Sequence, residues 1–155
     1  MRISIGADHR GYPLKERLIP WLRAEGYDVA DEGAATTSSV DYPDFAARVA
    51  EKVSHGEADR GILVCATGVG MCITANKVHG VRATTCGDEE VAKLSRQHND
   101  VNVLCLSGDR LDDAAAQRIL NVWLETEFEG GRHARRIEKI ADLELREFQQ
   151  QADGA

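Results

Sequence analysis

One stretch of the sequence, residues 61–77, constrains the fold more than any other. Residues 62–65 form a short apolar run, which is typical of a buried parallel strand and too short for a helix. A glycine-rich turn follows at residues 66–70, and apolar residues then recur at helical spacing from Val69. A strand, a glycine turn and a helix in this order predict an anion site, because the turn and the helix N-terminus both present backbone N–H groups.

Cys65 ends the predicted strand, at the edge of the sheet where α/β folds place their chemistry. A helix N-terminus favours the thiolate form of a neighbouring cysteine, so a reactive thiolate is one interpretation. The other is a small buried hydrophobe, the commoner role of a free cysteine, and this stretch leaves both open. Two other loop types fit the sequence less well. A cysteine phosphatase loop needs arginine where Met71 stands, which weakens that alternative, and a Rossmann Gly-x-Gly-x-x-Gly pattern needs glycine where Ile73 stands.

Composition narrows the classes of partner. The chain has 155 residues, enough for one domain with a real core, and a formal net charge of −7. An acidic chain without a basic run argues against nucleic acid. We expect no signal peptide and no membrane span, because no apolar run is long enough. The four cysteines show no C-x-x-C pairing, which predicts reduced thiols in a cytoplasmic protein, without a zinc site or a disulfide frame.

The order of the elements predicts the fold class. Five apolar runs read as strands: residues 2–7, 27–31, 62–65, 81–86 and 101–106. Helical patterns follow each of them, the first with Pro20 inside it as an expected kink or break, and the last over residues 133–148. We therefore predict a three-layer α/β/α sandwich with an open, five-stranded parallel, Rossmann-like sheet. Residues 1–148 form its single domain, and residues 149–155 form a frayed tail.

Polar side chains gather around the ends of these strands. Asp8 and His9 follow the first strand, and Arg110 follows the fifth, as Cys65 and its turn follow the third. His98 and Asn99 come at a helix end, just before the fifth strand. Arg132 and Arg136 are four residues apart and share a helix face, which suits a phosphate dianion. A solvated basic face is the alternative for these two arginines.

Six blocks of the sequence, in order, resemble the ribose-5-phosphate isomerase B family, which also includes galactose-6-phosphate isomerase subunits and allose-6-phosphate isomerases. The blocks are residues 6–11, 41–43, 65–70, 75–77, 95–100 and 130–133. They cover nearly the whole chain except its tail. The resemblance implies an aldose–ketose isomerase of the pentose phosphate pathway, acting on ribose 5-phosphate through a cis-enediolate.

The resemblance also implies a role for each matching residue. Cys65 is the base that moves a proton between carbons, and Thr67 and His98 help to open the furanose ring. The backbone of the turn holds the enediolate oxyanion. The residues expected to contact substrate are Asp8, His9, Ala66, Thr67, Gly68, Val69, Gly70, Asn99, Arg110, Arg132 and Arg136. These roles match the chemical requirements of aldose–ketose isomerisation, which needs a base, an oxyanion site and an acid.

Three features distinguish this chain within the family. Ala66 stands where glycine is usual, and its methyl group narrows the room beside the oxyanion. Met71 stands where members without the cysteine carry a glutamate base. The segment that ends at Arg110 is one residue longer than in better-known members, which leaves its alignment open.

The resemblance further implies homodimers or tetramers with active sites shared between subunits, and no metal or organic cofactor. Two alternatives to a ribose-5-phosphate isomerase stay open. One is an isomerase of a four- or six-carbon sugar phosphate, and the other is a non-catalytic module that binds phosphosugars. Retention of Cys65, Thr67, His98 and the arginine pair together favours an enzyme.

Overall fold

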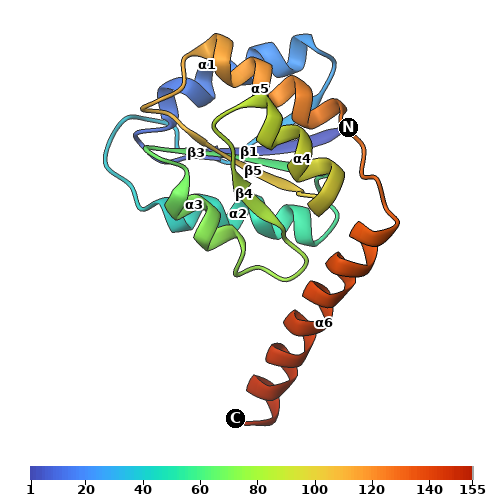
Figure 1. The fold of residues 1–155 in the computed structure, drawn as a ribbon. Coiled ribbons are helices and arrows are strands. Elements are labelled where there is room, and N and C mark those ends of the chain that lie inside the picture. The colour runs from blue at the N-terminus through green and yellow to red at the C-terminus, as the bar shows by residue number, and fades with distance from the viewer. Residues whose placement is uncertain (155) are drawn as a thin grey trace.

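The computed structural model describes residues 1–154, and within them the chain forms five strands and six helices (Figure 1). All strand pairs are parallel, and the order across the sheet is β2-β1-β3-β5-β4. The strands are β1 Arg2–Ala7, β2 Asp28–Asp31, β3 Arg60–Cys65, β4 Ala83–Thr85 and β5 Val103–Ser107. The predicted fold class, an open five-stranded parallel sheet, is confirmed.

Helices cover both faces of the sheet, and β3 lies at its centre (Figure 1). The helices are α1 Tyr12–Ala24, α2 Tyr42–Ser54, α3 Val69–Ala75, α4 Glu89–Asn99, α5 Asp113–Glu125 and α6 Arg132–Asp153. Helices α1, α4 and α5 pack on one face, over a core that includes Ile62 and Leu104. Helices α2 and α3 pack on the other face, over Leu63 and Val103. The alternation of buried side chains along β3 and β5 supplies both cores.

Several predicted elements differ from the structure. Helix α1 runs unbroken through Pro20, whose ring is exposed, and the Glu16 carbonyl that loses its N–H partner lies on the same wet face. Strand β4 is three residues long, because the backbone N–H of Arg82 donates to the Asn102 side chain at 2.7 Å instead of to a strand. Helix α6 continues to Asp153, through most of the predicted frayed tail; Ala155 lies outside the described residues.

Helix α6 stands apart from the rest of the fold (Figure 1). Of its 22 residues only His133 is buried, although the helix carries a strong apolar stripe. Leu143 is 49% exposed and Phe148 is 69% exposed. No helix among residues 1–154 is long and apolar enough to span a bilayer. A helix with this much uncovered apolar surface needs a partner to bury it.

Candidate active site

One group of predicted site residues gathers at the carboxyl edge of the sheet, and we call it the carboxyl-edge cluster. It follows β1, β3 and β5, which are neighbours in the sheet, so their ends meet at one place. Its members are Asp8, His9, Cys65, the turn of residues 66–70, and Arg110.

Cys65 is the last residue of β3, and it is 4% exposed. Its Sγ atom accepts a hydrogen bond of 3.2 Å from the backbone N–H of Gly68. Gly68 has a φ of 81°, a left-handed conformation that favours glycine, and it leads the chain from the strand into α3. An amide donor aimed at sulfur stabilises a thiolate, so this geometry suits a base.

The turn after Cys65 is fixed by the loop that follows β5. The carbonyl of Cys65 accepts from the backbone N–H of Gly108 at 2.8 Å, and the Ala66 carbonyl accepts from Ser107 Oγ at 2.6 Å. These bonds engage both carbonyl oxygens. The N–H of Val69 donates to Thr67 Oγ1 at 3.3 Å, whereas the Gly70 N–H has no acceptor within residues 1–154. The Gly70 amide is therefore one donor of this turn that is left for an oxyanion.

The β1 side of the cluster is built on Asp8, which is 6% exposed. Its Oδ1 atom accepts from the backbone N–H groups of Arg10 and Gly11, both at 2.9 Å. His9 follows, and its Nδ1 accepts from the Val40 N–H at 3.2 Å, which leaves Nε2 as the ring's donor. Asp8 thus shapes the turn that presents His9.

Tyr42 shapes the turn, although it was not among the predicted site residues. A Cβ atom on Gly70 would lie 2.7 Å from the Tyr42 ring, so the ring lies directly on the glycine backbone. Tyr42 is 41% exposed and flanks the turn from the start of α2. The sequence signal was the block of residues 41–43, which carried no role of its own. Its aromatic residue next to a proline marks the start of α2 beside the turn.

The remaining predicted site residues lie at the opposite, amino edge of the sheet, and we call them the amino-edge cluster. They are His98, Asn99, Arg132 and Arg136. A helix that follows a parallel strand runs back toward the start of that strand, so the end of α4 lies at this edge. The carbonyl of Asn99 accepts from the Arg82 Nε at 3.2 Å, just before β4 begins.

The connection from α5 to α6 is fastened to α4, and this places the start of α6 beside His98. The backbone N–H of Glu129 donates to the Gln97 carbonyl at 3.1 Å, and Arg96 Nε donates to the Thr126 carbonyl at 3.2 Å. The His98 and His133 rings are stacked, with centroids 4.3 Å apart and an interplanar angle of 11°.

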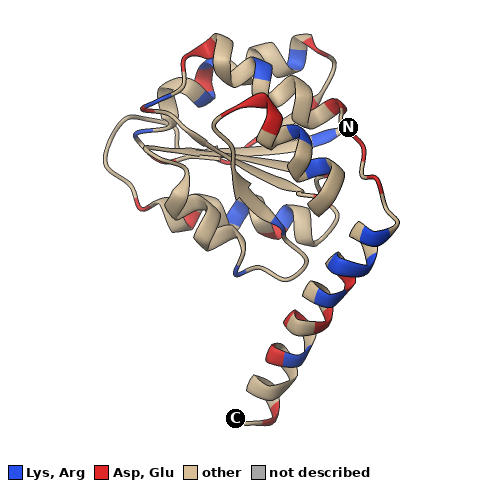
Figure 2. Cartoon of the chain, viewed as in Figure 1, with Lys and Arg blue, Asp and Glu red and all other residues tan. Residues whose placement is uncertain are grey.

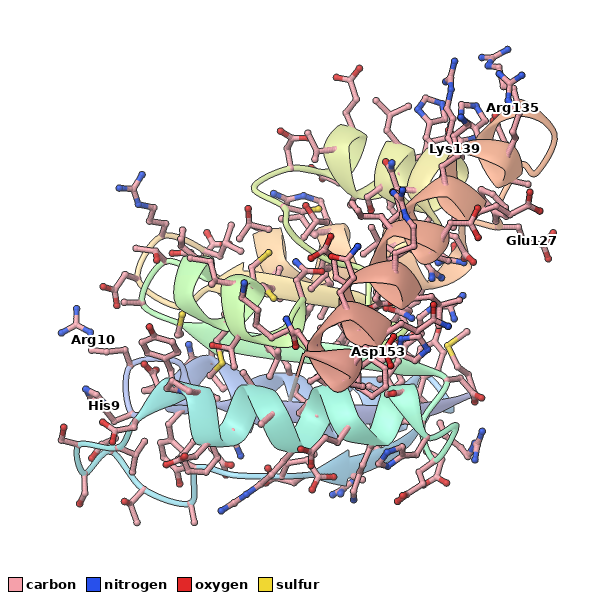
Figure 3. The ribbon with its side chains drawn as sticks, turned by 90° about the horizontal axis from the view of Figure 1, so that it is seen from below. His9, Arg10, Glu127, Arg135, Lys139 and Asp153 are labelled. Carbon is pink, nitrogen blue, oxygen red and sulfur yellow. The ribbon has the colours of Figure 1, made fainter. Side chains whose placement is uncertain are left out.

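The two clusters do not meet within one chain. Five residue steps of β3 separate the edges of the sheet, a length of about 16 Å. Figure 3 shows His9 and Arg10 at one end of the molecule, far from Arg135 and Lys139 at the start of α6. One chain therefore brings Cys65 to the same edge as Asp8, His9 and Arg110, but not to the edge of His98, Asn99 and the arginine pair.

Charge separates the two clusters as well. Figure 2 shows that basic residues gather at the start of α6, where Arg132, Arg135, Arg136 and Lys139 fall within two turns. At the carboxyl edge, Arg10 is paired with Asp109, Nη2 to Oδ2 at 2.7 Å. The basic start of α6 is the stronger candidate for holding a phosphate dianion.

A groove of about 840 Å³ lies between α4, the connection of residues 76–82 and α6. Its walls include Val91, Leu94 and Ile140, which are 45%, 39% and 53% exposed. The groove does not reach Cys65. Its apolar walls suit a protein surface better than a sugar phosphate.

Comparisons with known proteins identify the family. The family model described as Ribose/Galactose Isomerase matches residues 3–140. The ribose-5-phosphate isomerase B of Escherichia coli (strain K12) is 43% identical over 145 residues, covering 94% of this chain and 97% of that protein.

Solved structures agree as well. The ribose-5-phosphate isomerase B of Clostridium thermocellum has a TM-score of 0.93 at 48% identity, covering 94% of this chain and 99% of that chain. The ribose-5-phosphate isomerase B of Mycoplasma genitalium, solved with bound ribulose 5-phosphate, has a TM-score of 0.90 at 44% identity, covering 93% of this chain and 96% of that chain.

Proposed function

This chain belongs to the ribose/galactose isomerase family, and from that premise we propose that it interconverts ribose 5-phosphate and ribulose 5-phosphate. The observation that carries the proposal is Cys65 at the end of β3, buried and accepting the Gly68 amide. The Mycoplasma genitalium relative with bound ribulose 5-phosphate supports the choice of a five-carbon substrate. The proposal takes residues 1–148 as one isomerase domain, working in the cytoplasm.

The chemistry we propose begins with ring opening. His98 and Thr67 move the proton of the anomeric hydroxyl to the ring oxygen, which breaks the ring C–O bond and leaves the aldehyde. The Cys65 thiolate then takes the proton from the carbon next to the carbonyl. The electrons form a cis-enediolate, whose oxyanion the amides of residues 66–70 hold. The proton of the C2 hydroxyl then moves to the C1 oxygen, and the Cys65 thiol returns its proton to C1. This gives the ketose and restores the thiolate.

The phosphate contacts in this proposal come from Arg132 and Arg136, with Arg110 as a third. Their side chains lie one helical turn apart at the basic start of α6. Asp8, His9 and Asn99 contact the sugar hydroxyls. The methyl group of Ala66 and the room beside it limit the size of the sugar.

We propose that the active site forms between two chains, as a homodimer or within a tetramer. The carboxyl-edge cluster of one chain meets the amino-edge cluster of the other, which closes the gap that one chain leaves across its sheet. The exposed stripe of α6 and the groove beside α4 support this arrangement, because both are apolar and uncovered. A second copy of the chain would bury them.

A coupled isomerase assay over four-, five- and six-carbon aldose phosphates tests the proposed function. We expect the highest kcat/KM with ribose 5-phosphate. A four- or six-carbon aldose phosphate that exceeds ribose 5-phosphate tenfold would move the substrate assignment within the family. Binding of these sugars without turnover of any would instead identify a non-catalytic module.

A further inference from the structure

We propose that His98, Glu129 and His133 form a binding site for a divalent transition-metal ion of the zinc class, and that the ion inhibits the isomerase. The ion would not be a cofactor, because the proposed reaction uses His98 without a metal. The inhibition half of this inference rests on the proposed function, since it requires His98 to act in ring opening. The binding half stands on the structure alone.

The geometry brings three ligand groups to one point. One ligand atom from each of His98, Glu129 and His133 can be chosen so that all lie within 4.8 Å of one another. The Nε2 atom of His133 and Oε2 of Glu129 are already 3.6 Å apart. Ligand atoms around a tetrahedral zinc ion lie about 3.4 Å from each other, given metal–ligand bonds of about 2.1 Å. Once one histidine ring has turned toward the ion, these atoms fill three of the four positions, and water takes the fourth.

Three different elements supply the ligands, and the fold holds them in place. His98 comes from the last turn of α4, Glu129 from the connection, and His133 from the first turn of α6. The hydrogen bond from the Glu129 N–H to the Gln97 carbonyl ties the connection next to His98. The ligands are thus assembled by tertiary structure rather than by mobile surface side chains.

The buried nitrogen of His133 is the independent sign that something binds here. His133 is 6% exposed, and its Nε2 atom has no hydrogen-bond partner among residues 1–154. A buried polar atom without a partner is costly and rare, and a missing ligand is one of its ordinary explanations. This nitrogen lies on the side of the ring that Glu129 approaches, so an ion there would satisfy both groups.

The charges around the site limit its affinity for a metal. The positive charges of Arg132 and Arg136 oppose a cation, and one carboxylate offsets them only in part. We therefore expect micromolar rather than nanomolar affinity.

Coordination requires one rearrangement, and it explains inhibition. The two rings are stacked nearly parallel, so one must tilt out of the stack to aim its nitrogen at the ion. Glu129 is exposed and free to follow. A His98 ring bound to the metal cannot transfer a proton during ring opening. An ion beside Arg132 would also displace the substrate, so the inhibition should be competitive with ribose 5-phosphate.

Titration calorimetry of the full chain in metal-free buffer with Zn²⁺ tests the binding half. The variant is Glu129→Gln, which keeps the size of an exposed side chain and removes one ligand charge. We expect its affinity for Zn²⁺ to fall by about tenfold or more. Glu127→Gln, two residues away and also exposed, is the matched control and should bind as the wild type does. Equal affinities in wild type and Glu129→Gln would overturn the site.

Cysteines compete for Zn²⁺, so a second readout separates them from this site. Co²⁺ bound through thiolate gives a sulfur-to-metal charge-transfer band, whereas nitrogen and oxygen ligands do not. We expect Co²⁺ to bind the wild type without that band. The His133→Asn variant should lose the binding of Co²⁺. A strong band would show that the ion sits on sulfur, which would overturn the assignment.

Activity assays test the inhibition half. Zn²⁺ should raise the KM of the wild type for ribose 5-phosphate and leave kcat unchanged at saturating substrate. Glu129→Gln should keep the wild-type activity in metal-free buffer and need about tenfold more Zn²⁺ for the same inhibition. Full activity at a saturated site would overturn this half. Absence of turnover in metal-free buffer would count against the proposed function and leave the calorimetric result standing.

Discussion

At the scale of single residues, Cys65 is defined by what surrounds its sulfur atom. Burial excludes water, and the Gly68 amide at 3.2 Å supplies a fixed positive dipole. The sequence left two interpretations of Cys65 open, a thiolate and a small hydrophobe. This hydrogen bond is compatible with both, because the sulfur gives the buried Gly68 amide an acceptor in either case, and an ionised sulfur accepts such a bond more strongly.

We expect Cys65→Ser to lower kcat by about 100-fold or more while substrate binding persists, in line with typical general-base contributions. Serine keeps the shape and the Gly68 hydrogen bond, but its hydroxyl does not ionise near neutral pH. The measurement is kcat by coupled assay, with Kd from calorimetry. Near-normal turnover in this variant would place the base elsewhere.

Two other cysteines provide controls for that experiment. Burial raises the pKa of Cys86 to about 11, so Cys86→Ser removes an inert thiol and should keep kcat. Cys72 differs, because a hydrogen bond from the Cys105 thiol lowers its pKa to about 7 despite partial burial. Alkylation near neutral pH should therefore label Cys72 as well. Protection by substrate identifies Cys65 only in a Cys72→Ser background.

At the scale of elements, the fit of α1 against β3 depends on one glycine. Gly11 has an ordinary backbone conformation, with φ −84° and ψ −16°, so its requirement is space alone. A Cβ atom there would lie 2.1 Å from the carbonyl oxygen of Val64. The strand cannot retreat, because Val64 is in the middle of the sheet and pairs with β1 and β5.

We expect Gly11→Ala to destabilise the fold by about 2–3 kcal/mol, the range typical of overpacking against rigid structure. Chemical denaturation, read as the shift in midpoint at constant m-value, measures the loss. Gly87→Ala is the control, because a Cβ at Gly87 meets no atom within 4 Å, and its effect should stay below about 0.5 kcal/mol. Equal midpoints for the two variants would contradict the close packing of α1 on β3.

Prediction of helices and strands from the sequence succeeded where the apolar periodicity of an element and its capping residue agree. Asp112 directly precedes the helical pattern of α5, and its side chain caps the helix by accepting from the Ala115 N–H at 2.8 Å. It failed at Pro20, because the cost of a proline falls when the unpaired carbonyl lies on the wet face of its helix. The predicted end near residue 148 also differs from the structure, where α6 continues to Asp153 through Gln149, Gln150 and Gln151, which are good helix formers. Gly154 follows directly as the C-cap residue.

At the scale of the whole molecule, local patterns predict the layers but not the order of the strands. The order β2-β1-β3-β5-β4 depends on long-range pairing, and it alone decides that Asp8, Cys65 and Arg110 meet. The separation of the two clusters follows from the direction of α4, which returns His98 to the amino edge. The family resemblance implied a site shared between subunits, and this stays a prediction that the separation of the two clusters supports.

A shared site makes a prediction that no single-chain site can satisfy. Cys65→Ser damages only the carboxyl-edge cluster, and His98→Asn damages only the amino-edge cluster. In a dimer of one chain of each kind, one active site carries both changes and the other carries neither. Random reassociation of equal amounts makes half the dimers mixed, so the mixture should recover about one quarter of the wild-type activity.

The control pairs two variants from the same cluster, His98→Asn with Arg132→Ala. Each active site of their mixed dimer receives one damaged amino-edge cluster, so no site is intact. The activity of the mixture should therefore not exceed the sum of the activities that the two variants contribute on their own. Subunit exchange is verified by mass spectrometry of the mixed species. If Cys65→Ser and His98→Asn exchange fully yet recover nothing, each site is built within one chain. The dimer would then serve stability alone, through the apolar face of α6.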